Sequence, residues 1–211
     1  MESKIIEIFG IPGSGKTYYT EKIIKDNPQY FDFSKYLFSR TGNLYFKIFV
    51  HLRLSYLYEY KLTKQVITIM KPYLKNENVF GFNVKLINYV YQLIYLYHVK
   101  KKYLNKNVDV IFDEGIVHHL IGIEAEFNVP HDILISVYNI LNSIDLKKQT
   151  QNIFIDVPIN TAFKRIRMRN RKFSSMDYLN DTKLMTFLKN YHLACIKYGN
   201  DLPEVKLIKN D

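Results

Sequence analysis

The 211-residue chain has one cysteine, no long apolar run, no internal repeat and no low-complexity linker. A single cysteine excludes an internal disulfide framework and gives no zinc-knuckle spacing. Because Cys195 lies in the helical-looking stretch FLKNYHLACIKYG, we interpret it as a small buried apolar residue. The composition, 47% hydrophobic and 24% charged, indicates a globular protein and not a disordered one.

No stretch of the sequence has the pattern of a membrane span or a signal peptide. The longest apolar-rich stretch, at residues 84–99, is interrupted by Lys85, Asn88, Gln92 and His98 and falls short of the roughly 18–20 apolar residues that span a bilayer. The apolar run at residues 5–9 is too short for a signal peptide. We therefore expect a cytoplasmic protein.

The formal net charge is +10. A basic surface favours anionic partners such as nucleotides, nucleic acid or acidic lipid headgroups. A source genome whose proteins are generally rich in Lys, Asn, Ile and Tyr explains the same composition equally well. Charge alone therefore does not decide the function.

Five short apolar runs predict β-strands, and helical patterns separate them. This alternation is typical of an α/β fold with a parallel sheet and crossover helices. The third and fourth runs are almost continuously apolar, as expected for strands buried on both faces. We predict one domain over residues 1–211, with strands at residues 4–9, 35–39, 108–113, 152–157 and 205–208.

The segment between the second and third predicted strands, residues 41–107, is unusually long and rich in tyrosine. We expect two or three helices there, the main ones within residues 45–70 and 83–104. The aromatic side chains either pack between helices or line a pocket for an acceptor molecule. Helices that are apolar nearly all round must be buried somewhere, which favours a homodimer.

The sequence GIPGSGKT at residues 10–17 matches the phosphate-binding motif G-x-x-x-x-G-K-[ST]. A predicted strand precedes it and a predicted helix, at about residues 16–25, follows it, as such a loop requires. Glycines let the backbone approach a phosphate, and successive N–H groups face the anion. We predict that ATP and Mg²⁺ bind here, with Lys16 on the β- and γ-phosphates and Thr17 on the metal. The predicted nucleotide contacts in this loop are Gly10, Gly13, Ser14, Gly15, Lys16 and Thr17.

The stretch VIFDEGIVHHL, residues 110–120, ends an apolar strand with two carboxylates and then places two histidines. A zinc hydrolase is disfavoured because the spacing is neither H-E-x-x-H nor its inverse and because Gly115 weakens a helix there. We interpret His118 and His119 as ordinary polar positions in a loop or helix. Asp113 closes a strand beside the phosphate loop, where it can orient Mg²⁺ or accept a proton from an attacking hydroxyl. Glu114 is the second candidate for either role.

A basic segment follows the fourth predicted strand. Arg165 and Arg169 are four residues apart and share a helix face, and Arg167 and Arg171 form a second pair. The alternatives are a solvated basic face and a lid over residues 164–178 whose arginines close over the phosphates. We favour the lid, with Arg165 and Arg169 as catalytic residues and Arg171 as a nucleotide contact.

These motifs, in the order FGIPGSGKT, YLFSRTG, VIFDEG and FIDVPINTAFKRIRMR, resemble the nucleoside and nucleoside-monophosphate kinases of the phosphate-loop group, thymidylate kinase most closely. The resemblance covers most of the chain, and a long helix and a last strand, EVKLI, follow the basic segment. It implies a three-layer fold with strand order 2-3-1-4-5, places Arg165 and Arg169 on the lid arginines, and makes Arg40 a candidate acceptor contact.

The resemblance implies transfer of the γ-phosphoryl group of ATP to a small acceptor. Thymidylate kinases carry Asp-Arg where this chain has Asp113-Glu114, and Arg53 is the candidate substitute for the missing acceptor contact. A nucleoside, a nucleoside monophosphate, a sugar or another metabolite remains open as acceptor. The alternative function is a phosphate-loop ATPase that acts with nucleic acid or a protein partner.

Overall fold

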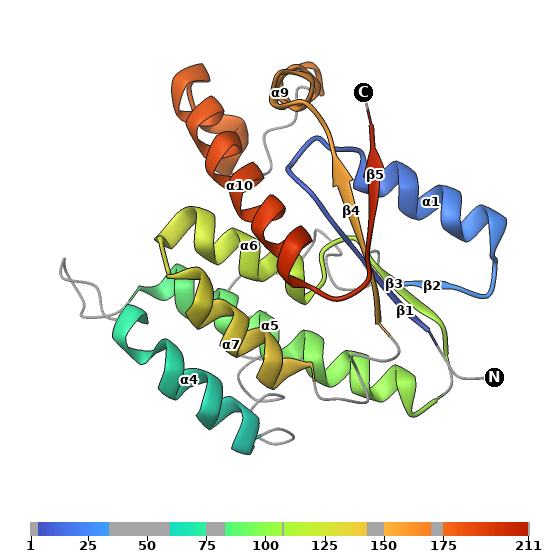
Figure 1. Cartoon of the computed structure of the whole chain (residues 1–211), viewed down its shortest axis with the longest axis vertical. Helices are drawn as coiled ribbons and strands as arrows, with labels where there is room; N and C mark the ends of the chain where they lie inside the picture. Colours follow the sequence, from blue (N-terminus) through green and yellow to red (C-terminus); the bar gives the residue numbers. More distant parts are fainter. Residues whose placement is uncertain are drawn as a thin grey trace.

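The computed structural model describes residues 4–33, 60–74, 83–106, 108–142, 150–169 and 175–210. Its five strands form one parallel sheet in the order β2-β3-β1-β4-β5 (Figure 1), which confirms the expected order. The predicted strand at residues 35–39 lies outside the described residues, and the described second strand lies just before it. The strands are β1 (Ile5–Phe9), β2 (Phe31–Asp32), β3 (Val110–Phe112), β4 (Thr150–Asp156) and β5 (Val205–Lys209).

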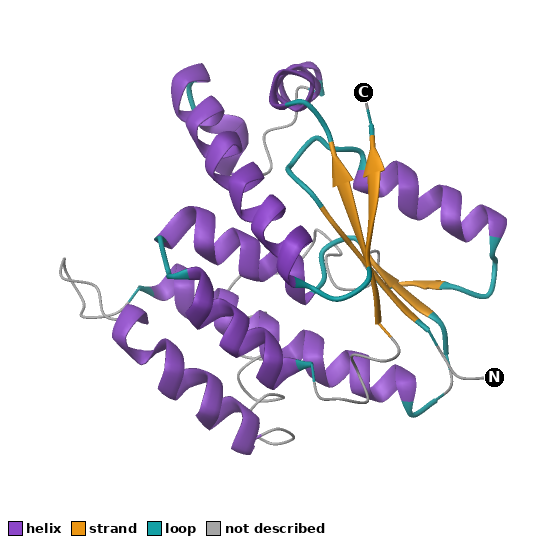
Figure 2. Cartoon of the chain, viewed as in Figure 1, coloured by secondary structure: helices purple, strands orange, loops and turns teal. Residues whose placement is uncertain are grey.

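Helices cover both faces of the sheet, which gives the expected three layers (Figures 1 and 2). Helix α1 lies on one face, and α5, α6, α7 and α10 lie on the other, with α4 packed outside α5 and α7. Helix α9 follows β4 at the carboxyl end of the sheet. The helices are α1 (Lys16–Asp26), α4 (Tyr60–Leu74), α5 (Val84–Leu104), α6 (Ile116–Phe127), α7 (His131–Leu141), α9 (Ile159–Met168), the 3₁₀ turn η1 (Ser175–Tyr178) and α10 (Asp181–Asp201).

Strand β1 lies in the centre of the sheet and contributes to two apolar cores. Successive side chains of a strand point to opposite faces. Ile6 and Ile8 therefore join the core under α1, whereas Ile5 and Phe9 join the larger core under α5, α6, α7 and α10. The same alternation directs Glu7 into the larger core, where it is 1% exposed.

Helix α5 is apolar on most of its surface because this chain surrounds it. Leu86, Val90, Leu93, Ile94 and Leu96 are all buried, and α5 packs against α4, α6 and α7. The feature that favoured a homodimer is therefore accounted for within one chain, and the homodimer remains a prediction. None of the described helices is long and apolar enough to cross a membrane.

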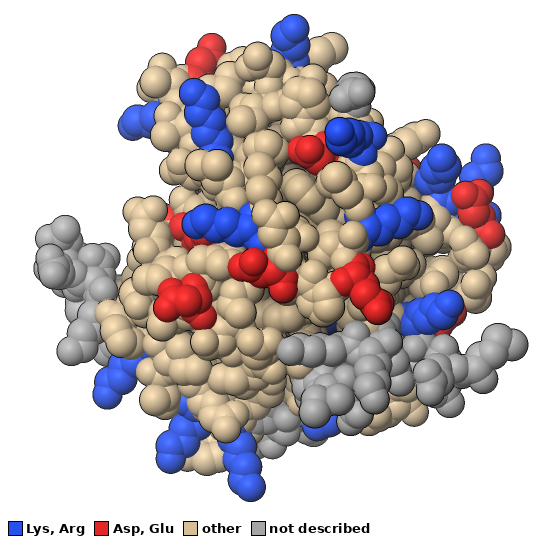
Figure 3. All heavy atoms as spheres, in the orientation of Figure 1, with Lys and Arg blue, Asp and Glu red and all other residues tan. Residues whose placement is uncertain are grey.

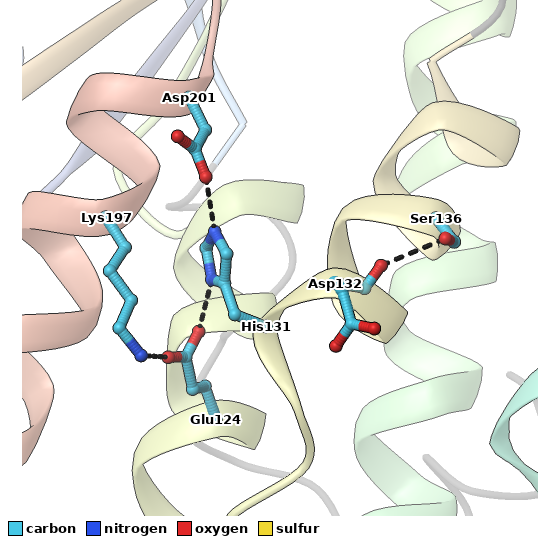
Figure 4. Close-up of polar contacts among 6 residues, drawn as sticks. All are labelled: Glu124, His131, Asp132, Ser136, Lys197 and Asp201. Carbon is cyan, nitrogen blue, oxygen red and sulfur yellow. Dashed lines mark hydrogen bonds and ion pairs between the residues drawn. The ribbon is translucent and has the colours of Figure 1, made fainter.

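His131, the first residue of α7, contacts side chains of α6 and α10 (Figure 4). Its Nδ1 lies 2.7 Å from Glu124 Oε2 on α6, and its Nε2 lies 2.8 Å from Asp201 Oδ2 on α10. Carboxylates only accept hydrogen bonds, so each of these contacts is a hydrogen bond when the His131 nitrogen that faces it carries a proton. Lys197 donates to the other Glu124 oxygen at 2.7 Å, which adds a second link between α6 and α10.

We predict that His131→Ala lowers the free energy of unfolding by about 1–3 kcal/mol, because it leaves the carboxylates of Glu124 and Asp201 without this donor. The matched control is Ser136→Ala on the same helix, which removes only an exposed bond to Asp132 O and should cost less than about 0.5 kcal/mol. Urea denaturation of both variants measures the difference, and equal losses would contradict a role for His131 in joining the helices.

Candidate functional site

The phosphate loop begins where β1 ends, at the edge of the sheet where the carboxyl ends of β3 and β4 also lie. In open α/β folds, ligands bind at this edge. Gly10, Gly13 and Gly15 have φ angles of +153°, +84° and +93°, which side chains disfavour. A Cβ on Gly13 would lie 2.8 Å from Ala162 O on α9, so glycine also allows this helix to pack directly on the loop.

Lys16 is the first residue of α1, and its ammonium group folds back over the loop. Its Nζ donates to Gly10 O at 2.9 Å and to Ile11 O at 3.3 Å. Burial lowers the pKa of Lys16, the carboxylates of Glu114 and Asp113 oppose this effect, and the Arg169 guanidinium adds to it. The loop carbonyl groups thus accept the hydrogen bonds of the Lys16 ammonium group that a phosphate oxygen would accept in a nucleotide complex.

Two further features of the loop fit a phosphate ligand. Ser14 is buried, and its Oγ has no hydrogen-bond partner among the described residues. Helix α1 has no acidic residue in its first turn, so the positive end of its dipole is not neutralised there. The loop therefore has the donors, the backbone geometry and the electrostatics of an anion site.

The structure brings Asp113 and Thr17 together across the sheet edge. Asp113 follows β3 directly, and Thr17 Oγ1 donates to Asp113 Oδ2 at 3.4 Å. A hydroxyl and a carboxylate are hard oxygen ligands, and Mg²⁺ is usually held by one or two such groups together with water and phosphate oxygens. The pair fits Mg²⁺. No group of three or more His, Cys, Asp and Glu side chains able to hold a metal occurs in the part of the chain that is described.

Glu114 follows Asp113 in the chain, and its charge interacts with those of Asp113 and Lys16. Burial raises the pKa of Glu114, the Asp113 charge adds to the rise, and the Lys16 charge opposes it. A carboxyl group whose pKa is shifted toward neutrality is suited to proton transfer. Asp113 and Glu114 thus have different surroundings, since Asp113 lies beside the Thr17 hydroxyl and the charges of Asp113 and Lys16 both act on Glu114.

His118 and Tyr191 form a hydrogen-bonded pair within range of the Lys16 and Glu114 charges. Tyr191 Oη on α10 lies 3.1 Å from both His118 Nδ1 and His118 O. Burial lowers the pKa of His118 well below its usual range, with Lys16 and His119 adding to the shift, and burial raises the pKa of Tyr191 well above its own. Both groups are therefore neutral near pH 7, and the pair forms an uncharged wall of the site.

His118 and His119 are more closely packed than the sequence analysis expected. Both are part of α6, which begins immediately after Gly115. His119 is 4% exposed, and its ring nitrogens lie 2.9 Å from Gly115 O and from Gln92 Oε1 on α5. It therefore joins α5 to the first turn of α6.

The last described residue, Asn210, fastens the phosphate loop from the far side. Its backbone N–H donates to Asp156 O at 2.8 Å, and its side-chain amide donates to Ser14 O at 2.7 Å. Asp156 ends β4, and its carboxylate accepts from His192 Nε2 on α10 at 2.9 Å. The ends of β4 and β5 therefore hold the middle of the loop in place.

The arginines of the predicted lid separate into different environments. Arg167 donates to Asp181 Oδ1 at 2.9 Å and to Leu179 O at 2.7 Å, so it joins α9 to the start of α10. Arg169 lies 3.8 Å from Asp177 Oδ1, and its charge acts on Lys16. Arg165 shares the helix face of Arg169. Arg171 lies outside the described residues, as do the candidate acceptor contacts Arg40 and Arg53.

A cavity of about 530 Å³ lies between the N-terminal ends of α5 and α10 and the C-terminal end of α6. Phe127 and Phe187 give it apolar walls, and Lys85 and Glu126, which form an ion pair, give it a charged rim. Tyr89 lies beside this cavity, because its Oη donates to Glu126 Oε1 at 3.2 Å. Burial raises the pKa of Tyr89, and the charges of Glu126 and Glu114 add to the rise.

Sequence reasoning missed Glu7, Asn210 and Tyr191. A charged residue at an inward position of the apolar run IIEIF is a signal for Glu7, because a buried charge needs a partner. Asn210 and Tyr191 carry no local signal, since each acts on a residue that is distant in the sequence.

Comparison with known proteins agrees with the fold. No protein-family model and no curated protein matches the chain. A deoxyadenosine kinase from M. mycoides, solved with the products dCMP and a flexible dCDP, has a TM-score of 0.54 at 19% identity, over 98% of this chain and 90% of that one. A thymidylate kinase from Candida albicans has a TM-score of 0.52 at 14% identity, over 99% of this chain and 84% of that one. At these identities the likeness shows the fold alone, a five-stranded parallel sheet in the order β2-β3-β1-β4-β5 with helices on both faces.

We predict that Asn210→Ala weakens binding of an ATP analogue about five- to tenfold, because one hydrogen bond that fixes the loop is worth about 1 kcal/mol. Isothermal titration calorimetry measures the change. Asn27→Ala is the matched control, since Asn27 also donates its side-chain amide to a backbone carbonyl, Ile23 O, but at the far end of α1. Equal affinities of the two variants would show that Asn210 does not order the loop.

Proposed function

We propose that the protein is an ATP-dependent kinase that transfers the γ-phosphoryl group to a small-molecule acceptor. The observation that carries this proposal is the convergence of Lys16, Thr17, Asp113 and Glu114 at one edge of the sheet. Lys16 and the loop amides bind the phosphates. Thr17 and Asp113 are the residues that would hold Mg²⁺, which would supply positive charge to the β- and γ-phosphates.

Glu114 accepts the proton of the acceptor hydroxyl. The hydroxyl oxygen forms a bond to the γ-phosphorus, the bond from that phosphorus to the β–γ bridging oxygen breaks, and ADP leaves with the electron pair. Burial raises the pKa of Glu114, which suits this carboxylate to accept a proton. Asp113, beside Thr17, is the metal-orienting carboxylate.

The lid arginines supply positive charge to the transferring group. Arg165 and Arg169 share one face of the α9 region, and packing of Gly13 on Ala162 keeps this helix on the loop. Arg171 is the third candidate of the lid. Arg167 has a different role, since its guanidinium group donates to Asp181 and to Leu179 O in the junction between α9 and α10.

The acceptor is a nucleoside or a nucleoside monophosphate bound toward the cavity beside Tyr89. The shared fold with a deoxyadenosine kinase and a thymidylate kinase supports this class. The cavity volume of about 530 Å³ is within the range of small-molecule sites, and Phe127 and Phe187 suit a planar base. Arg40 and Arg53 remain the predicted contacts to an acceptor phosphate.

An ATPase that acts on nucleic acid is the alternative, and the surface charge bears on it. On the face shown in Figure 3, lysine and arginine side chains of the described residues lie among aspartate and glutamate side chains. A strand of nucleic acid requires a groove of one charge along its backbone. The mixed charge of this face gives the alternative no support there.

The proposal is tested by measuring ATP turnover and product formation with nucleosides, nucleoside monophosphates and sugars, and separately with DNA and RNA. We expect a phosphorylated nucleoside or nucleotide. Turnover stimulated by nucleic acid alone, with no phosphorylated small molecule, would exclude the kinase. Lys16→Ala should lower turnover at least about a hundredfold, as loss of one group that stabilises transition-state charge does. Lys22→Ala, an exposed lysine on the same helix, is the control and should retain wild-type turnover.

The raised pKa of Glu114 predicts the pH dependence of the reaction. The rate should rise with pH along a limb whose midpoint lies above the ordinary glutamate pKa of about 4.3, because the carboxylate is the active form. Glu114→Gln should remove the limb and lower kcat by about 10²–10⁴-fold. His118→Gln should keep the limb, since burial holds His118 neutral in this range. A limb that disappears with His118 and not with Glu114 would reverse the assignment.

The same shift affects stability with a defined sign. Because the pKa of Glu114 is higher in the folded state than in the unfolded state, folding binds a proton. Its contribution to stability is fully present below the unfolded-state pKa and is lost as the pH rises through the folded-state pKa.

A further inference from the structure

Glu7 places a carboxylate in the middle of the larger core, three residues before the phosphate loop. It is 1% exposed and lies on the central strand β1, next to Phe112 of β3 in the sheet register. An unpaired carboxylate at such a position is strongly unfavourable, so its contacts indicate what it does there.

The Glu7 carboxylate has two partners from different helices. Lys100 of α5, also 1% exposed, forms an ion pair with Oε1 and donates to Asn142 Oδ1 at 3.2 Å. The backbone N–H of Val117 donates to Oε2 at 3.1 Å. Val117 is the second residue of α6, so Glu7 accepts one of the N–H groups that the start of a helix leaves without a partner in the helix.

Helix α6 has no cap of its own because its N-cap residue is Gly115. A Cβ at this position would lie 2.7 Å from Glu7 Oε2 and Cδ, so any larger residue would displace the carboxylate. Gly115 therefore allows Glu7 to take the place of a capping side chain. A negative charge is also favourable at this end of a helix dipole.

Gly115 directly follows Asp113 and Glu114, so the cap lies beside the carboxylates of the proposed reaction. The geometry points to Glu7 as a positioning residue: it caps α6 and thereby holds Asp113 toward Thr17 and Glu114 toward Lys16, with Lys100 as its counterion. This inference rests on the proposed function for the roles of Asp113 and Glu114. Strand β1 then positions both parts of the site. The phosphate loop follows the carboxyl end of β1, and Glu7 of β1 positions the carboxylates of Asp113 and Glu114.

Two double variants separate this role from a contribution to stability alone. Glu7→Gln with Lys100→Met removes both charges and keeps an oxygen that can accept from Val117 N. Glu7→Leu with Lys100→Met removes the charges and the cap, and replaces the ion pair by apolar groups of similar volume, which folded proteins often tolerate. Both variants lose the bond from Lys100 to Asn142. The Leu variant also loses the cap, whereas the Gln variant keeps the cap but buries an amide N–H₂ group without its former partner, and the two losses are of similar size.

We expect similar melting temperatures for the two double variants and a kcat at least about tenfold lower without the cap, because small displacements of reacting groups cost one to two orders of magnitude. The KM for ATP should change less than kcat. Equal kcat values in the two variants would overturn the positioning role.

A second readout does not depend on turnover. Mg²⁺ should strengthen binding of a non-hydrolysable ATP analogue in the Gln variant as in wild type, and at least about fivefold less in the Leu variant, because Asp113 is displaced from Thr17. If no acceptor is phosphorylated but this difference is found, the proposed function fails and the positioning role stands. If the Leu variant does not fold, Gly115→Ala in the wild-type background replaces it, and an unchanged Mg²⁺ effect there would also overturn the inference.

Discussion

The pairing of β1 with both β3 and β4 is the constraint on which the site depends. Because all three strands are parallel, their carboxyl ends meet at one edge, and the phosphate loop, Asp113 and Asp156 follow those ends directly. A parallel sheet of this kind needs helices on both faces, and the apolar side chains of β1 point alternately into the two cores. The interactions that fix the sheet therefore also fix the distances among the groups of the site.

Polar side chains within the larger core connect the helices to this edge. Glu7 binds both α5 and the start of α6, and His119 joins α5 to Gly115 O. Tyr191 brings α10 against His118. Each of these groups is buried, so each is favourable only while its partner is in place. The first turn of α6 is consequently held by contacts with β1, α5 and α10, although its N-cap residue is a glycine.

The sequence predicted the local parts of the structure well, since the phosphate loop is a continuous motif whose glycines, lysine and hydroxyl act within eight residues. The strand order came from the family resemblance, because apolar periodicity predicts strands but not their neighbours. The second strand was expected at residues 35–39, which lie outside the described residues. The described strand Phe31–Asp32 is a run too short for periodicity to detect. The all-round apolar character of α5 was detected, but a single sequence cannot say whether helices of the same chain or of a second chain cover it. Contacts such as Asn210 to Ser14, which join the two ends of the chain, depend on the completed fold.

The electrostatics of the site link the protonation of Lys16 and Glu114 to the ligands of the proposed reaction. Burial opposes both charges, since it lowers the pKa of Lys16 and raises that of Glu114, and each charge partly offsets the cost of the other. In the proposed reaction, a triphosphate beside Lys16 raises both pKa values, which favours the charged lysine but disfavours the Glu114 carboxylate. A divalent cation at Thr17 and Asp113 has the opposite effect on Glu114. In the proposed reaction, a cation held by Thr17 and Asp113 would therefore also favour the ionised form of Glu114 when a nucleotide is bound.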